Sequence, residues 1–277
     1  MIRYLIICLV SLIAISCGDY EKQDLNVIAE ANKQFPSDSN IVLVNIGTLS
    51  RADLAREIEI ISLNNPRVVG IDGIFKDLKD QISDSLLESS FRKIDRLVLG
   101  SRIIYVSRKK SFDTLITSHK YFLANARIGY FNSGTSEEII DNINVDIPRF
   151  FSVSEIIKNH KYQHFIVEII RGFDSIKYEK FLKRRNQIEY INFEGGYDRF
   201  RKLDVKDIFN PRAELSFLKN KIILIGFLGS TIGDSSKEDK FYSPLRFLNP
   251  DSKEPDLFGV EFLARGVAMI LAESYID

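Results

Sequence analysis

Two short apolar runs are the clearest pattern in the chain. Residues 41–46 read Ile-Val-Leu-Val-Asn-Ile, and residues 221–226 read Lys-Ile-Ile-Leu-Ile-Gly. A strand with one face in water alternates apolar and polar residues, whereas a continuous apolar run is typical of a strand covered on both faces, as in a parallel sheet. The two runs therefore predict two central strands that lie side by side in a layered α/β domain.

The residues after the first run predict a βαβ unit. Ser50 is a suitable N-cap for a helix over residues 51–63, in which leucine and isoleucine recur every three or four positions. An Asn-Asn-Pro sequence ends this helix, and residues 67–71 follow as a second buried strand. The crossover between such parallel strands is expected to be right-handed.

Weaker patterns predict the remaining elements. Helices are expected at residues 83–93, 152–171, 179–185, 214–218 and 258–276, and strands at residues 97–99, 103–106, 121–130 and 187–193. A long loop over residues 227–257 would lead to the final helix, and loops of that length are usually functional or mobile. The predicted fold is a single α/β domain whose mainly parallel central sheet is flanked by helices.

The start of the chain has the pattern of an export signal. A basic residue at Arg3 precedes an apolar stretch at residues 4–15, and a cysteine, Cys17, follows small residues. The stretch is shorter than the roughly 20 apolar residues that a spanning helix needs, but it suits a signal peptide. We expect residues 1–17 to be a signal peptide with lipid attachment at Cys17; an uncleaved membrane anchor is the alternative. Residues 18–40 would then form a tether with a short helix, and residues 41–277 the extracytoplasmic domain.

Composition excludes several classes of function. The chain has 38 Lys plus Arg and 38 Asp plus Glu, so its net charge offers no long-range attraction for nucleic acid. Its only cysteines are Cys8 and Cys17, which leaves the domain without a disulfide or a thiolate metal site. His160 and His164 are four positions apart, but they lack the glutamate of a metalloprotease motif and are expected to be surface histidines on one helix face. No cofactor or catalytic motif is recognised, and no metal or cofactor is predicted.

Candidate ligand-binding residues follow from the rule that ligands of parallel sheets bind beyond the carboxyl ends of the strands. Asn45, Gly47, Asp72, Gly226 and Asp239 are expected to meet there. The alternative is that the two aspartates hold turns by accepting hydrogen bonds from backbone amides, which aspartate beside glycine often does.

Four segments of the chain resemble the second type of CHASE domain, the sensory extracellular modules associated with cyclases and histidine kinases of bacteria. They comprise residues 41–47, 66–75, 218–226, and 239–245 followed by Gly-Val-Glu at 259–261. The resemblance places the family's characteristic residues at Asp72, Phe75, Asp84, Leu87 and Asp239, the last of these standing before Ser243-Pro244. The chain departs from the family at Leu263 and Arg265, where histidine and asparagine are frequent, and at Ser243, where threonine is usual.

The resemblance implies an extracytoplasmic sensory domain that recognises a ligand and performs no chemistry. Its expected partners are a small molecule or protein ligand, the membrane, and a signalling output protein. One alternative is an extracytoplasmic hydrolase, which requires Asp72 and Asp239 close together in a cleft beside a metal or a nucleophile. Another is a structural envelope lipoprotein, which predicts no pocket at the strand ends.

Overall fold

The computed structural model describes residues 38–106, 111–123, 125–140, 143–235, 237–248 and 253–276. Their centre is a seven-stranded sheet with the order β11-β1-β12-β2-β3-β4, in which β5 also pairs with β3. The strands are β1 (Asp38–Asn45), β2 (Val68–Ile71), β3 (Leu97–Val106), β4 (Ser111–Ile116), β5 (Ala126–Tyr130), β11 (Phe200–Leu203) and β12 (Ile222–Gly226). Every pair is parallel except β3 with β4.

The two apolar runs are neighbouring central strands, as predicted. Leu43 of β1 pairs with Leu224 of β12, and Val44 pairs with Ile225. Strand β12 lies between β1 and β2, so the βαβ unit formed by the start of the domain skips one position in the sheet.

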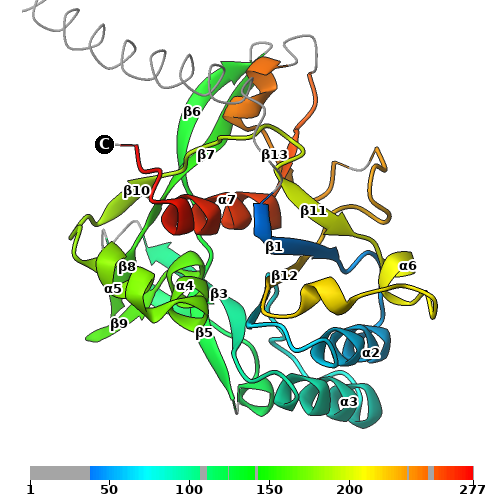
Figure 1. Cartoon of the computed structure of the whole chain (residues 1–277). Coiled ribbons are helices and arrows are strands. Elements are labelled where there is room, and N and C mark those ends of the chain that lie inside the picture. Colours follow the sequence, from blue (N-terminus) through cyan, green and yellow to red (C-terminus); the bar gives the residue numbers. More distant parts are fainter. Residues whose placement is uncertain are drawn as a thin grey trace, which may run out of the picture.

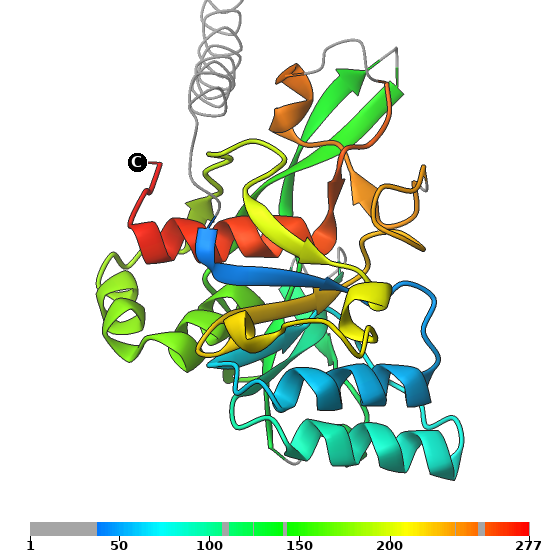
Figure 2. The same ribbon diagram turned by 45° about the vertical axis from the view of Figure 1, so that its right-hand side comes forward.

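Helices cover both faces of this sheet (Figures 1 and 2). On one face α2 (Arg51–Ser62) and α3 (Gln81–Arg92) pack on alternate strand residues such as Val42 and Val44. On the other face α4 (Phe165–Phe173) and α7 (Gly259–Ala272) pack on Ile41 and Leu43. The two faces of each central strand therefore contact two different apolar cores. This explains why the strand sequences do not alternate between apolar and polar residues. The predicted single α/β domain with a mainly parallel sheet is confirmed.

Smaller elements are attached to this frame. Strands β6 (Gly134–Ile140), β7 (Ile143–Ser152) and β10 (Ile188–Tyr190) form an antiparallel sheet, and β13 (Lys240–Phe241) pairs with β14 (Leu257–Phe258). Helix α5 (Ser175–Leu182) contacts α4 and α7. The short helices are η2 (Lys120–Phe122), α6 (Val205–Ile208), η3 (Ser216–Leu218) and η4 (Pro244–Leu248).

The predicted helix over residues 152–171 is wrong in its first half. This segment contains the end of β7, then the hairpin of β8 (Ser154–Ile157) and β9 (His160–Gln163), and α4 begins only at Phe165. The reason is a two-residue turn at Lys158 and Asn159, both of which have positive φ, at 50° and 67°. Such a turn matches the twist of a hairpin.

Other boundaries also differ from the predictions. Strand β3 is continuous where two short strands were expected, and only the second half of residues 121–130 is a strand. The predicted loop at residues 227–257 contains β13 and η4. Strand β11 and helix α6 are absent from the predictions, because their polar residues hide the pattern.

The signal peptide at residues 1–17 and the lipid attachment at Cys17 lie outside the described residues, as does the tether up to residue 37. Asp38, Ser39 and Asn40 belong to β1 and not to the tether. None of the helices in the described ranges has both the length and the apolar character that crossing a bilayer requires.

Candidate functional site

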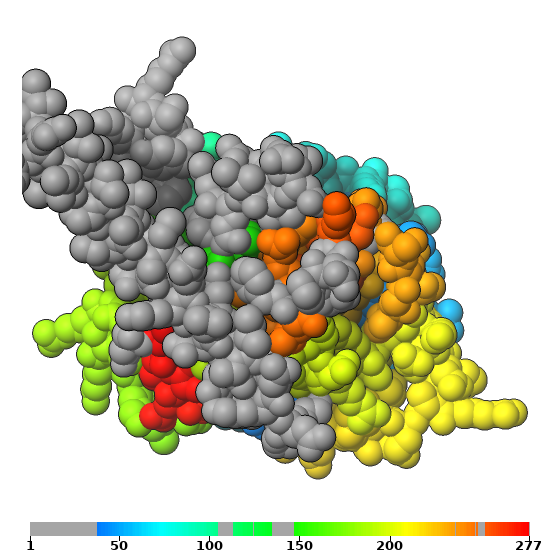
Figure 3. Space-filling view, turned by 90° about the horizontal axis from the view of Figure 1, so that it is seen from above, coloured from blue at the N-terminus to red at the C-terminus, as the bar shows by residue number. Residues whose placement is uncertain are grey.

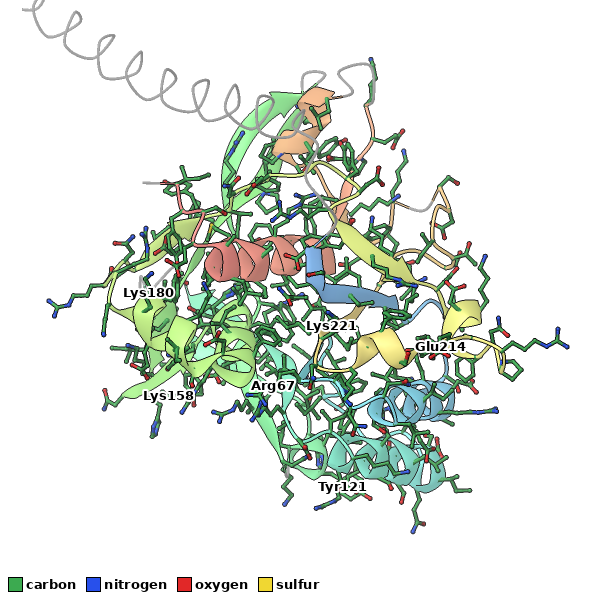
Figure 4. The ribbon with its side chains drawn as sticks, in the orientation of Figure 1. Arg67, Tyr121, Lys158, Lys180, Glu214 and Lys221 are labelled. Atoms are coloured by element: carbon green, nitrogen blue, oxygen red, sulfur yellow. The ribbon has the colours of Figure 1, made fainter. Side chains whose placement is uncertain are left out.

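A pocket of about 390 Å³ lies where the carboxyl ends of β2 and β5 approach the amino end of α7. Its walls combine three charged groups with apolar and aromatic side chains. The lining residues are Asp72, Arg102, Phe131, Asn132, Ser133, Pro148, Asp239, Phe241, Gly259, Phe262 and Leu263. Arg67 and Lys221, labelled in Figure 4, directly precede β2 and β12. They mark the amino ends of these strands, opposite the ends that form the pocket.

The parallel sheet positions one side of this pocket. Asp72 directly follows β2, and its backbone N–H donates to the Ile225 carbonyl at 2.8 Å. Phe131 directly follows β5, and its N–H donates to the Ser101 carbonyl at 3.0 Å. Both residues form one more backbone hydrogen bond with the neighbouring strand after their own strand ends. This bond fixes the position from which each side chain extends beyond the carboxyl ends of the strands.

The segment before α7 supplies the other side. Lys240 of β13 pairs with Phe258 of β14, which brings the preceding Asp239 beside the first residue of α7, Gly259. This segment, orange in Figure 3, is exposed on the face seen from above. It therefore connects the pocket directly with the molecular surface.

A buried network around Asp256 holds the same segment. The Ser243 backbone N–H and hydroxyl donate to the Asp256 carboxylate, each at 2.7 Å, and the Tyr197 hydroxyl donates to it at 2.8 Å. Ser243 is fully buried. Since Ser243 stands where the resembled family usually has threonine, a hydroxyl at this position has a structural purpose in this chain.

Asp72 and Asp239 approach each other at Gly259. A Cβ atom at Gly259 would lie 3.4 Å from Asp72 Oδ2 and 3.8 Å from Asp239 Oδ2. Within the described ranges neither carboxylate accepts a hydrogen bond from any donor. The alternative in which both aspartates hold turns through backbone amides is therefore not what this part of the chain shows.

The electrostatics of the pocket favour protonation of these acids. Burial, and then the negative charge of Asp239, raises the pKa of Asp72 to about 7 against the opposing effect of Arg102. The pKa of Asp239 is also raised, mainly by burial and then by Glu238, and is again opposed by Arg102. The Asp72 carboxyl therefore keeps its proton to a higher pH than an ordinary aspartate does.

Asn45 and Gly47 lie outside the pocket lining. The Asn45 amide donates to Asp204 Oδ1 and to the Gly229 carbonyl, both at 3.0 Å. Its oxygen accepts from the backbone N–H of Gly47 at 3.0 Å and of Leu228 at 2.8 Å. All the bonding capacity of this buried amide is therefore used to join the ends of β1 and β12 to their loops.

Gly226 has a packing role at the same edge. A Cβ atom there would lie only 2.7 Å from the Cβ of Val260. The glycine allows α7 to lie directly on β12, so it helps to place the pocket without lining it.

The two histidines do not share a helix face, contrary to the prediction. His160 is exposed on β9, whereas His164 is fully buried and caps α4. The His164 Nδ1 accepts from the Ile166 N–H, and its Nε2 lies 3.3 Å from the carbonyl oxygen of Asn132, a pocket residue. His164 thus supports the pocket wall from behind.

Sequence reasoning missed most of the wall, including Arg102, Phe131 and Phe241. Phe131 directly follows a strand, so the same strand-end rule would have found it. Leu263 and Arg265, the two departures from the resembled family, have different roles. Leu263 lines the pocket, and the fully buried Arg265 donates to the carbonyls of Glu194 and Gly196.

The fold and the site together define an α/β domain with a pocket at the strand ends, an arrangement typical of ligand-binding domains. The family model described as CHASE2 domain matches residues 23–277, and the chain belongs to this family. CHASE2 domains are extracellular sensory domains of signalling proteins, which confirms the sensory type of domain and supports an extracytoplasmic location. Searches of curated proteins and of solved structures found no match.

Proposed function

We propose that this domain senses a small molecule outside the cytoplasm by binding it in the pocket between Asp72 and Asp239. The observation that carries the proposal is that two distant segments bring these carboxylates together at Gly259 without a hydrogen-bond donor among the described residues. Asp72 is half-buried and Asp239 is exposed, so a ligand that enters between them can supply the donors that both carboxylates lack among the described residues. The protein acts by recognition and performs no chemistry of its own.

The pocket walls suggest how binding is transmitted. Asp239 and Phe241 belong to the segment before α7, and Gly259 and Phe262 belong to α7 itself, so one ligand contacts both. A ligand changes the position of this segment only if it binds two arrangements with unequal affinity. The signal then leaves through α7 to an output protein.

Two rival functions make different demands on this site. A structural envelope lipoprotein predicts no pocket at the strand ends, yet the described residues enclose one. A hydrolase shares the paired carboxylates, but it also needs a nucleophile or a metal beside them. The sensory role of the family favours recognition over either rival.

The proposed function is tested with a variant in which a larger side chain blocks the pocket. Gly259→Val places methyl groups between the two carboxylates, where a Cβ meets only ordinary van der Waals contacts of 3.4 Å or more. Purified wild type and variant are equilibrated with a metabolite extract, desalted, and analysed by thermal shift and by mass spectrometry of released molecules. We expect a retained molecule with the wild type and none with Gly259→Val. An equally retained molecule in both proteins, or none in either, would overturn the proposal.

We also propose that a lipid on Cys17 holds the domain to the membrane. The sequence of residues 1–17 supports this, since its apolar stretch is of signal-peptide length and ends at a cysteine. Labelling of expressing cells with an alkyne fatty acid should mark the wild type and Cys8→Ser but not Cys17→Ser. Equal labelling of the wild type and Cys17→Ser would contradict the anchor.

A further inference from the structure

The pocket contains more negative than positive charge. Among the described residues of the lining, Asp72 and Asp239 are the two acids and Arg102 is the single basic residue. Arg102 is exposed and its guanidinium lies 5.6 Å from the centre of the Phe131 ring, so it stands at the rim. With both acids ionised, the described lining residues leave one negative charge uncompensated.

The remaining walls suit an organic body. Phe262 and Leu263 are almost fully buried, and the Phe241 ring lies 3.7 Å from the position of a Cβ at Gly259. Burial of the apolar surface of a ligand against these side chains is favourable, whereas a hydrated divalent ion obtains no binding free energy from them. The described residues also contain no group of three acidic, histidine or cysteine side chains that could hold a metal.

We propose that the ligand is a small organic monocation, whose protonated amine is held between Asp72 and Asp239 and whose apolar body rests on Phe241, Phe262 and Leu263. This inference rests on the proposed function and names its ligand class. A single positive charge neutralises the pocket, and ammonium N–H groups supply the donors that both carboxylates lack.

The acids and Arg102 carry opposite charges, so their substitutions should change the affinity for an amine in opposite directions. Removing an acid weakens binding of an amine, whereas removing Arg102 strengthens it, because the guanidinium repels the ligand's charge. A residue that only maintains the fold would not produce changes of opposite sign. Binding should also displace a proton, since Asp72 is partly protonated at neutral pH and faces Asp239 and Arg102, with Glu238 beside Asp239.

Three probes of similar size and different charge provide the experiment: benzylamine, benzyl alcohol and benzoate. Isothermal titration of the folded full chain, followed by chemical-shift mapping, is expected to show benzylamine alone bound at the pocket. Asp72→Asn and Asp239→Asn should each weaken benzylamine by about tenfold, and Arg102→Gln should tighten it about threefold, as expected for partly screened charges. Titrations in buffers of different ionisation enthalpy should show proton release near pH 6.5 that Asp72→Asn abolishes.

Two outcomes would overturn the inference. Benzyl alcohol or benzoate binding at the pocket as well as benzylamine does would exclude the cation preference but leave the pocket as a sensor site. No binding of any probe at millimolar concentration would also reject the inference. In that case the comparison with Gly259→Val in metabolite extract decides separately whether the proposed function survives. Because chemical shifts are mapped on the wild type as well, a variant that fails to fold does not remove the test.

Discussion

Glu57 of α2 lies beside Asp204, the N-cap of α6, and both oxygens of the fully buried Glu57 carboxylate lack a hydrogen-bond partner among the described residues. Burial, and then the negative charge of Asp204, raises the pKa of Glu57 to about 8. Asp204 itself is well satisfied, since it accepts from Asn45, Val205 and Ile232. The unfavourable member of the pair is therefore Glu57.

Glu57→Gln should stabilise the domain at alkaline pH. The folded pKa is raised above the unfolded value, so the contribution of Glu57 to stability is greatest below about pH 4.5 and is lost as pH rises through 8. The variant has no such loss, and its advantage should grow by about 3–5 kcal/mol between pH 4 and pH 9. Urea unfolding at both pH values measures this change.

Glu59→Gln is the matched control for that prediction. Glu59 is on the same helix but is exposed and pairs with Lys93 at the surface, so its replacement should change stability little at any pH. A difference between Glu57→Gln and wild type that does not vary with pH would contradict the prediction.

His164 should limit stability on the acid side. Burial lowers its pKa to about 3, so below its usual pKa of 6.5 the unfolded chain binds a proton that the folded chain excludes. Stability should fall as pH falls from 6.5, by up to about 1.4 kcal/mol per pH unit. His164→Asn, which keeps an N-cap acceptor, should be less stable overall but should lose this dependence.

The control is His160→Asn, at the exposed histidine of β9. We expect its stability to follow the wild type from pH 7 to pH 4 in the same urea titrations. An unchanged acid slope in His164→Asn would show that another group is responsible.

The sequence allowed the central sheet to be predicted because its strands are buried on both faces. The run at β12 has no polar residue, which is typical of a strand covered on both faces. The hairpin of β8 and β9 was missed because its signal is only the conformation of Lys158 and Asn159, which neither residue requires in isolation. Local pattern therefore predicted the layers but not the turn.

The candidate site was partly predictable for a similar reason. The strand-end rule selects Asp72 and Asn45 equally, because both follow or end a buried strand. Their different roles depend on contacts between distant residues: Asn45 bonds to groups 159 and 184 positions away. Gly259 could not be inferred, because only the pairing of β13 with β14 and the packing of α7 bring it to the pocket. Arg102 lies inside β3, between the two short strands that the sequence predicted there.

Arg265→Met should destabilise the domain by about 3 kcal/mol, because it leaves buried carbonyls of the 194–196 loop without donors. Arg201→Met provides the comparison, since Arg201 is exposed and the one contact of its guanidinium among the described residues is with the Phe217 ring. That variant should change stability by less than about 1 kcal/mol. Equal effects of the two variants in urea unfolding would contradict a structural role specific to Arg265.

Asn45→Asp tests whether Asn45 is structural, as its contacts indicate, or part of a ligand site. The replacement keeps the shape but sets a carboxylate against Asp204 Oδ1 and the Gly229 carbonyl, which the amide now satisfies at 3.0 Å each. An unpaired buried charge of this kind should cost about 3–5 kcal/mol at pH 8. The loss should be smaller at pH 4, because the raised folded pKa makes a new aspartate more harmful as pH rises.

Asn40→Asp, at the exposed start of the same strand, should be nearly neutral in the same urea titrations. If Asn45→Asp instead unfolds like the wild type and loses only ligand retention, Asn45 belongs to the recognition surface and the hydrogen bonds that join β1 to its neighbouring loops are dispensable. Loss of stability in Asn45→Asp with ligand retention intact under native conditions would assign recognition to Asp72 and Asp239, leaving Asn45 to hold the sheet edge on which their pocket is built.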